Sequence, residues 1–286
     1  MMIFRAMNSD VAVIADRDAV HAIHQTFVAA EQRFSRFRED SELMQLNRAT
    51  EPMIVSEPMF AALVAARHYV ELTDGIFDPA IGATLVALGY DRSFEPGTLD
   101  RDRDGDAPAA ARFLDVELDP TSREVTRPHD VQIDLGGMIK GRTVDEATRW
   151  LGRDGAIDAG GDAVMRGGGS NGWLVEIEDP RDPSCTLATI RVRDRAVATS
   201  AANYRRWQVA GAHRHHIVDP RTQRSAATDL LQVSVVAPTA ELADVLAKTV
   251  FILGAERGRA MIERHGDVGA VLIATDGSPT TCGVVS

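Results

Sequence analysis

Apolar residues recur along the first part of the chain with the spacing of amphipathic helices. Positions 20, 23, 27, 30 and 34 are all apolar, and this spacing predicts a helix within residues 17–37. The apolar segment 60–75 predicts a second helix that ends at a glycine. Residues 11–15 form a short apolar run ahead of the first helix, which is typical of a strand.

Strand patterns dominate the second half of the chain. We predict strands within 156–167, 173–179, 187–193, 196–200, 205–210, 215–219 and 230–237, and a final strand at 269–274. Helices are predicted from Gly136 to Gly152, at 240–254 after the cap residue Thr239, and at 255–264. Because helices and strands mix without strict alternation, the pattern predicts an α+β (mixed α/β) fold with mixed or antiparallel sheets and packed helices.

Length and charge narrow the class of protein. The chain has 286 residues, of which 44% are hydrophobic, so it can bury a sizeable core. We interpret residues 1–286 as one domain, with two intertwined lobes as the alternative and a surface loop at 91–111. The formal net charge of −11 argues against nucleic acid or an anionic membrane as a partner. No apolar run is long enough to span a bilayer and no signal peptide pattern is seen, so we expect a cytoplasmic protein.

The sequence does not support several common binding and catalytic motifs. The segment GGGSNG (167–172) has the glycine spacing of a dinucleotide fingerprint, but a strand pattern follows it, so we predict a hairpin turn. The acidic segment within 91–111 lacks the glutamate that closes a calcium loop. No Walker A sequence, HExxH zinc motif or nucleophile elbow is present. The two cysteines have no spacing typical of a metal site, and we interpret them as ordinary thiols.

The segment IDLGGMIKG (133–141) carries more specific chemistry. Its two glycines open a predicted helix, where free backbone amides favour an anion. Lys140 would lie about one turn into that helix, within reach of a phosphate, and Asp134 would accept hydrogen bonds from a base or a ribose. The alternative interpretation is a plain helix cap with an exposed lysine.

Three further segments are ambiguous when taken alone. In HHIVDPRT (215–222), His216 lies three residues before Asp219, and a histidine near a carboxylate can act as a base near neutral pH. The alternative is a strand that ends in an Asp-Pro turn. Thr199 and Ser200 lie at a predicted strand end. Asp244 and Lys248 are four residues apart on a helix, either as a surface ion pair or with Asp244 offered to Mg²⁺.

Taken in order, these segments resemble the FAD:protein FMN transferase (ApbE) family. The matching segments are 31–47, 73–85, 133–147, 155–167, 173–180, 197–200, 215–222 and 233–254, which together span nearly the whole chain. The resemblance implies an enzyme that binds FAD, uses Mg²⁺ at the pyrophosphate, and moves FMN onto a Thr or Ser hydroxyl of a partner flavoprotein with release of AMP. Positioning and charge neutralisation carry most of the catalysis in transfers of this kind.

The resemblance also implies roles for individual residues. Asp134 and Lys140 match family contacts to FAD, and His216 matches the family histidine, which we assign to activating the incoming hydroxyl. The Gly137 carbonyl and Asp244 match the metal ligands. The family's flavin contacts correspond to Met7, Phe37, Ile76, Phe77, Asp78 and Ile217.

This chain departs from the family pattern in three places. Lys248 stands where the family has a threonine that also serves the metal, and a protonated lysine has no lone pair to offer. Thr249 comes one residue late and would point about 100° away on a helix. Two outcomes follow: Mg²⁺ binds with Asp244, the Gly137 carbonyl and more water, or the Lys248 ammonium partly replaces the metal. Gln223 stands where the family has a glycine, which predicts a strained or altered turn if a positive φ is required, and the segment after Ser200 is changed as well.

Two other functions compete with the transferase. The first is an FAD pyrophosphatase, in which water replaces the acceptor hydroxyl and FMN is released free. The second is an FAD-binding protein without catalysis. AMP release separates the two enzymes from the binding protein, and covalent flavin on a target separates the two enzymes from each other.

Overall fold

The structure is a computed structural model that describes residues 1–95, 110–203, 205–209 and 211–285. Its internal contacts group into two compact units. Unit 1 comprises Met1–Val28, Lys140–Tyr204 and Ala227–Ser286, and unit 2 comprises Ala29–Ile139 and Arg205–Ala226. The interpretation of 1–286 as a single domain stays a prediction. Most of the predicted surface loop 91–111 lies outside the described residues.

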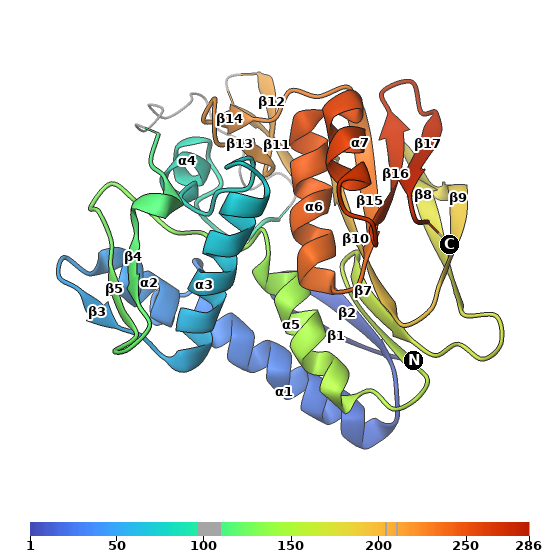
Figure 1. Cartoon of the computed structure of the whole chain (residues 1–286), viewed down its shortest axis with the longest axis horizontal. Helices are drawn as coiled ribbons and strands as arrows, with labels where there is room; N and C mark the ends of the chain where they lie inside the picture. The colour runs from blue at the N-terminus through green and yellow to red at the C-terminus, as the bar shows by residue number, and fades with distance from the viewer. Residues whose placement is uncertain (96–109, 204, 210, 286) are drawn as a thin grey trace. The chain divides into compact units, whose positions relative to one another are not determined.

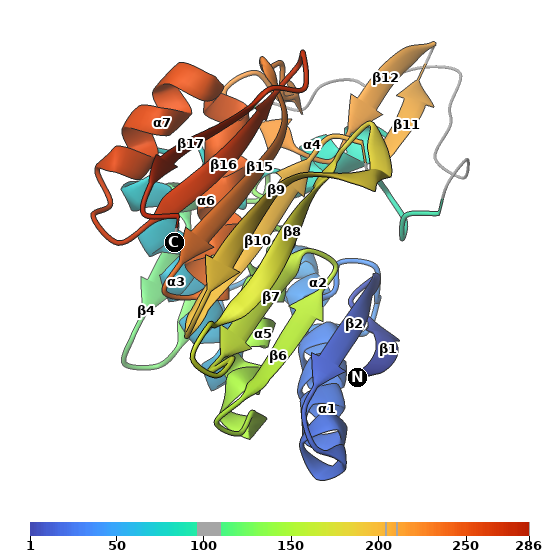
Figure 2. The same ribbon diagram turned by 90° about the vertical axis from the view of Figure 1, so that its right-hand side faces the viewer.

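Unit 1 is built on an eight-stranded sheet (Figure 2), whose neighbouring strands all pair antiparallel. In sheet order the strands are β1 (Met2–Ala6), β2 (Ser9–Ile14), β6 (Gly155–Ala159), β7 (Asp162–Arg166), β10 (Arg195–Ala201), β15 (Leu230–Ala237), β16 (Gly269–Ala274) and β17 (Pro279–Gly283). Strand β15 is almost fully buried, as expected of a strand covered on both sides, although Gln232 and Ser234 within it are polar.

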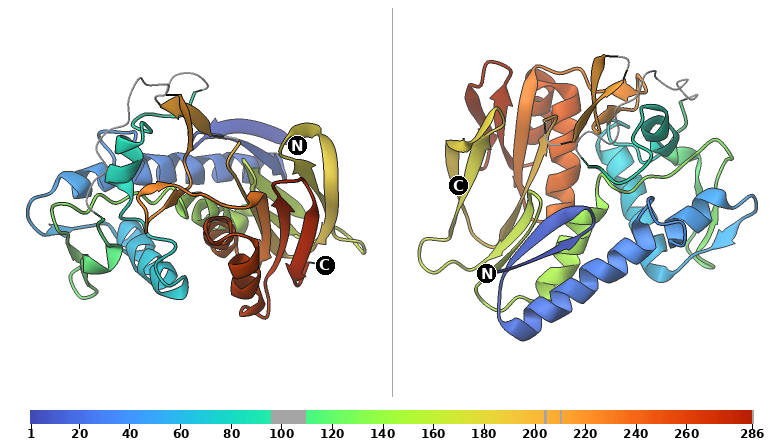
Figure 3. Two further views of the ribbon diagram at one scale, coloured as in Figure 1. Left: turned by 90° about the horizontal axis from the view of Figure 1, so that it is seen from above. Right: turned by 180° about the vertical axis from the view of Figure 1, so that it is seen from behind.

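The two faces of this sheet are covered by different elements. Along β7 and β10, Val164 and Ala196 join a core cluster with residues of α1 (Arg17–Phe34) and α5 (Ile139–Ala147). Their neighbours Ala163 and Val197 join a second cluster with the hairpin β8 (Trp173–Asp179) and β9 (Asp182–Val192). Successive residues of a strand point to opposite faces, so the hairpin and these helices lie on opposite sides. Two further helices, α6 (Ala240–Leu253) and α7 (Ala255–Glu263), lie side by side next to β15 and β16, across the sheet from the hairpin (Figures 1 and 3).

Unit 2 combines short helices with three small antiparallel sheets. Its helices are α2 (Glu42–Arg48), α3 (Glu57–Leu72), α4 (Gly82–Ala87) and the 3₁₀ turn Phe113–Asp115; a further 3₁₀ turn, Thr148–Trp150, follows α5 in unit 1. Its strands are β3 (Met53–Ile54), β4 (Glu117–Asp119), β5 (Glu124–Thr126), β11 (Arg206–Val209), β12 (Ala212–His215), β13 (Val218–Asp219) and β14 (Arg224–Ser225). The side chains of Ser41 and Ser56 accept the amides of Met44 and Met59 and so cap α2 and α3.

The long elements agree with the sequence prediction, and four local predictions are wrong. The segment 156–167 is not one strand, because β6 and β7 within it pair with each other. Residues 215–219 are not one strand, because His215 ends β12 and Val218 begins β13. The strand at 269–274 is not the last, because β17 pairs with it. GGGSNG is a turn followed by a strand, as predicted, but not a hairpin, because its flanking strands β7 and β8 belong to different sheets. No helix in the described ranges is long and apolar enough to cross a membrane, and the cytoplasmic location stays a prediction.

Candidate active site

The segment 133–141 folds as a tight turn that leads into α5. The Asp134 amide donates to the Pro79 carbonyl at 2.8 Å, and the Asp134 Oδ1 atom accepts the Gly136 amide at 2.6 Å. A Cβ on Gly136 would lie 2.8 Å from the same Oδ1 atom, so a side chain at this position would displace the Asp134 carboxylate. One of the amides predicted to be free for an anion is therefore already used by Asp134. The role of the Gly137 carbonyl stays a prediction.

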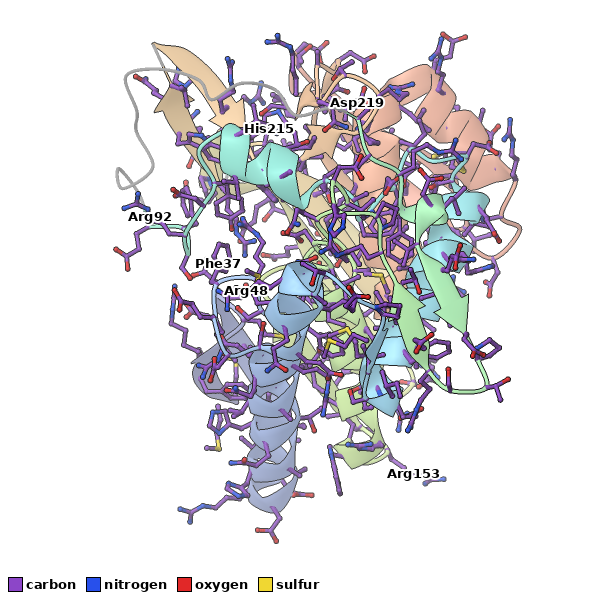
Figure 4. All side chains as sticks on the ribbon, turned by 90° about the vertical axis from the view of Figure 1, so that its left-hand side faces the viewer. Phe37, Arg48, Arg92, Arg153, His215 and Asp219 are labelled. Atoms are coloured by element: carbon purple, nitrogen blue, oxygen red, sulfur yellow. The ribbon has the colours of Figure 1, made fainter. Side chains whose placement is uncertain are left out.

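Arg36 holds the other oxygen of Asp134, and sequence reasoning missed this residue. The Arg36 Nε atom lies 2.6 Å from Asp134 Oδ2, and both side chains are about nine-tenths buried. The guanidinium lies 4.1 Å from the ring centroid of Phe37 and 4.4 Å from that of Tyr90. Tyr90 in turn stacks on Trp207, whose indole donates to the Leu88 carbonyl at 2.7 Å. The carboxylate of Asp134 and the ring of Phe37 (labelled in Figure 4), both predicted to contact FAD, are thus fixed by one arginine.

The predicted flavin contacts Ile76, Phe77 and Asp78 follow α3 directly. The Phe77 amide donates to Thr73 Oγ1 at 3.1 Å, and both apolar side chains are buried. Asp78 Oδ1 accepts the amides of Ala80 at 2.8 Å and Phe113 at 3.1 Å. Burial raises the pKa of Asp78 above its ordinary value, although these amides oppose the shift. The Asp78 carboxylate therefore ties two loops of unit 2 together.

Asp219 belongs to an Asp-Pro turn, which is one of the two alternatives that the sequence left open. Its carboxylate is held by Arg221, with Oδ1 at 2.9 Å from Nε and Oδ2 at 2.8 Å from Nη2. The same Asp-Pro-Arg arrangement occurs at 179–181 in unit 1, so it is a local property of the turn. Burial lowers the pKa of the neighbouring His215 imidazole. Ile217 is buried and its carbonyl accepts the Ala226 amide at 2.9 Å.

The turn after Asp219 confirms that Gln223 occupies a position with positive φ. Its φ is 56°, in the left-handed region that favours glycine. The side chain is buried, donates from Nε2 to the Pro220 carbonyl at 2.7 Å, and accepts the Thr84 hydroxyl at Oε1. Gln223 therefore adopts the left-handed conformation that a glycine would adopt, and its side-chain hydrogen bonds stabilise that conformation.

In unit 1, the two lysines and two aspartates form a buried charge cluster. Lys140 Nζ lies 2.6 Å from Asp162 Oδ2 on β7 and donates to the Ala159 carbonyl at 2.7 Å. Lys248 pairs with Asp244 Oδ1 one turn away on α6. A Cβ on Gly141 would lie 2.5 Å from the Ala240 carbonyl, so glycine lets α5 approach the first turn of α6. We name the set Lys140, Asp162, Asp244 and Lys248 the buried charge cluster.

Asp244 is not part of a surface ion pair, because its side chain is only 3% exposed. Burial raises its pKa to about 7, and the charge of Asp162 adds to this shift, while Lys248 and Lys140 oppose it. Its Oδ2 atom is buried and accepts no hydrogen bond from the described part of the chain. Thr249 is fully buried and donates to the Val245 carbonyl at 2.8 Å, so its hydroxyl serves the helix, as its position predicted.

Two other predicted positions lie elsewhere in unit 1. Met7 is in the turn between β1 and β2 with a φ of 50°, and its side chain packs against the cluster beneath α1. Thr199 on β10 shares a hydrogen bond of 2.8 Å with Ser234 on β15. Within the described ranges, the structure shows no group of three or more His, Cys, Asp and Glu side chains arranged to hold a metal.

The comparison with protein families assigns the chain. The model of the ApbE family matches residues 7–272. The chain belongs to the ApbE family. The "FAD:protein FMN transferase" of Treponema pallidum is 33% identical, with 93% of this chain and 81% of that protein covered. That of Vibrio cholerae is 27% identical, with 85% and 76% covered.

Solved structures of ApbE proteins share the fold. The ApbE protein of Thermotoga maritima has a TM-score of 0.88 at 26% identity, covering 98% of this chain and 96% of the other. The flavin transferase ApbE of Vibrio cholerae has a TM-score of 0.82 at 22% identity, covering 98% and 95%. These likenesses confirm the predicted α+β ApbE-like fold. The roles of individual residues in this ApbE protein stay predictions.

Proposed function

We propose that this chain is an FAD:protein FMN transferase. It takes FAD, transfers the FMN portion to a Ser or Thr hydroxyl of a partner flavoprotein, and releases AMP. The observation that carries the proposal is the match to the ApbE family along residues 7–272, with relatives that bear this enzyme's name.

The reaction exchanges one bond to phosphorus for another. The acceptor oxygen forms a bond to the phosphorus of the FMN portion, and the bond from that phosphorus to the bridging oxygen breaks. The bridging oxygen leaves with AMP, and the proton of the acceptor hydroxyl passes to His216. A neutral imidazole is suited to this step near neutral pH.

The geometry of unit 2 supports FAD binding at Asp134. A carboxylate offers about four lone-pair positions, and Arg36 and Gly136 use one on each oxygen. The remaining positions accept hydrogen bonds from a base or a ribose. Because Arg36 is clamped between Phe37 and Tyr90, the carboxylate is held in one orientation before the ligand arrives. In unit 1, the family resemblance assigns Lys140 to a phosphate group, and its ammonium would reach one by exchanging a contact with Asp162 or the Ala159 carbonyl.

We also propose Mg²⁺ as the metal of the reaction. The buried Asp244 Oδ2 atom without a hydrogen-bond donor fits a hard cation that prefers oxygen ligands. In unit 1, Asp244 would hold the ion. When bound, Mg²⁺ supplies neutralisation of the negative charge that the pyrophosphate carries.

The test combines purified protein, FAD, Mg²⁺ and an acceptor peptide of the family type. AMP and peptide-bound flavin are followed by mass spectrometry. The proposal expects both products in equal amounts, and it expects the His216→Ala variant to lose both while it still binds FAD. AMP together with free FMN and unlabelled acceptor protein would identify a pyrophosphatase instead. Bound FAD without AMP would overturn both enzymatic functions.

A further inference from the structure

The position of Lys248 conflicts with a carboxylate that is free for a metal. Lys248 and Asp244 lie one turn apart on α6, and the ammonium contacts Asp244 Oδ1. The lysine side chain is about four-fifths buried, so the contact is not a solvated surface pair. An ammonium has three donors and no lone pair, and therefore blocks one oxygen of Asp244 without serving as a ligand itself.

The charges of the buried cluster are already balanced. When both carboxylates are ionised, Asp162 and Asp244 carry two negative charges, and Lys140 and Lys248 carry two positive charges at close range. A divalent cation placed at Asp244 Oδ2 would leave an excess of two positive charges in a site with little solvent. Like charges repel strongly when they are buried, because screening by water is weak there. A divalent ion therefore binds well only if the Lys248 ammonium moves away.

The composition of the chain singles out the same two lysines. Of the 31 lysines and arginines, only Lys140 and Lys248 are lysines, and both lie in this cluster. Everywhere else the chain uses arginine as its cation. Lysine differs from arginine in carrying a compact point charge on a flexible stem, which is the property that a displaceable cation needs.

We infer that Lys248 is a built-in competitor for the divalent cation at Asp244, so that metal binding requires displacement of its ammonium. This inference rests on the proposed function for the identity of the cation, and it concerns a residue that sets the affinity for that cation. The inference accounts for both oxygens of Asp244: Oδ1 contacts the Lys248 ammonium, and Oδ2 is the position where the cation would bind.

Metal binding is measured directly, without turnover. Mg²⁺ is titrated into the full-length protein by calorimetry, for the wild type and for Lys248→Met, Lys248→Thr and Asp244→Asn. Both Lys248 variants are expected to bind Mg²⁺ at least about tenfold more tightly, because a buried like charge has been removed. Asp244→Asn is expected to lose binding. The control is Arg257→Met, which removes an exposed cation from α7 and should leave the affinity unchanged.

A second measurement uses the wild type alone and does not depend on a variant that folds. Protein labelled with ¹³C at lysine gives only two lysine side-chain signals, since the chain has two lysines. The Lys248 signal is expected to shift saturably with Mg²⁺ at the concentration that calorimetry reports. Unchanged or weaker Mg²⁺ binding in Lys248→Met, or a Lys248 signal that stays fixed while Mg²⁺ binds, would overturn the inference. Failure of the proposed function would appear separately, as absence of AMP.

Discussion

The Gln223→Gly substitution separates backbone strain from side-chain bonding at one position. Glycine removes the cost of a left-handed conformation, which is about 1–2 kcal/mol for a residue with a Cβ. It also removes the hydrogen bond from Gln223 Nε2 to the Pro220 carbonyl and the acceptor of the Thr84 hydroxyl. The prediction therefore turns on which of these two effects is larger.

The free energy lost with the side-chain hydrogen bonds is larger than the backbone strain that glycine relieves. A net hydrogen bond contributes about 0.5–1.5 kcal/mol, and a buried polar group left unpaired costs about 1–3 kcal/mol. The Thr84 side chain is fully buried, so its hydroxyl loses its partner without access to water. Glycine adds about 0.5–1 kcal/mol through the greater entropy of the unfolded chain. The sum of these losses exceeds the relieved strain, and we expect Gln223→Gly to lower the free energy of unfolding by about 1–3 kcal/mol.

The assay is urea unfolding followed by circular dichroism, with Gln223→Ala and Arg123→Gly alongside. Gln223→Ala should be less stable than Gln223→Gly, because alanine keeps the strain and loses the same bonds. Arg123 has a φ of 61° but an exposed side chain, so Arg123→Gly should be neutral or slightly stabilising. If Gln223→Gly were as stable as the wild type or more stable, the buried hydrogen bonds would not offset the strain and the reasoning would fail.

Three further predictions concern charged side chains. Arg36→Lys keeps the positive charge beside Asp134 but loses the planar contact with the rings of Phe37 and Tyr90. We therefore expect this variant to bind FAD more weakly, as measured by flavin fluorescence. The control Arg38→Ala, which removes an exposed ion pair, should leave FAD binding unchanged. Asp145→Asn should lower the free energy of unfolding in urea by about 1–3 kcal/mol, because the carboxylate accepts the first two amides of α6 at 2.8 Å each and an amide has one acceptor oxygen. The Arg181 side chain and the Arg181 backbone amide lower the pKa of Asp179 to about 2. This carboxylate therefore stabilises the fold above its unfolded pKa of about 3.9, and that stability is lost as pH falls toward 2. In Arg181→Ala, a ¹³C NMR titration should show a higher pKa that stays below about 3.9, because alanine keeps the backbone amide.

The sequence was most informative where local patterning decides structure. The apolar spacing of α1 and the cap residue Thr239 of α6 predicted both helices, because packing of one face and satisfaction of helix amides act over a few residues. The family resemblance placed a glycine at position 223 and so raised the question of a positive φ there, and the structure gives Gln223 a φ of 56°.

Long-range pairing was not predictable from local patterns. No local pattern distinguishes Arg36 from the other arginines, and its contact with Asp134 exists only in the folded chain. The contact between Asp162 and Lys140 is likewise not visible in the sequence around either residue. The spacing of Asp244 and Lys248 fits a surface pair and a buried pair equally well, because burial depends on what packs over the helix. The two alternatives for Asp219 could not be separated from the sequence either, because the contact with Arg221 depends on the conformation of the turn.

The central claim is tested most directly by following AMP and protein-bound flavin together. Purified protein, FAD, Mg²⁺ and an acceptor peptide with a Ser or Thr flavinylation site are incubated and analysed by mass spectrometry. The account predicts AMP and peptide-linked FMN in equal amounts, with both products lost in His216→Ala. FAD that binds and stays intact under every Mg²⁺ concentration would contradict the account.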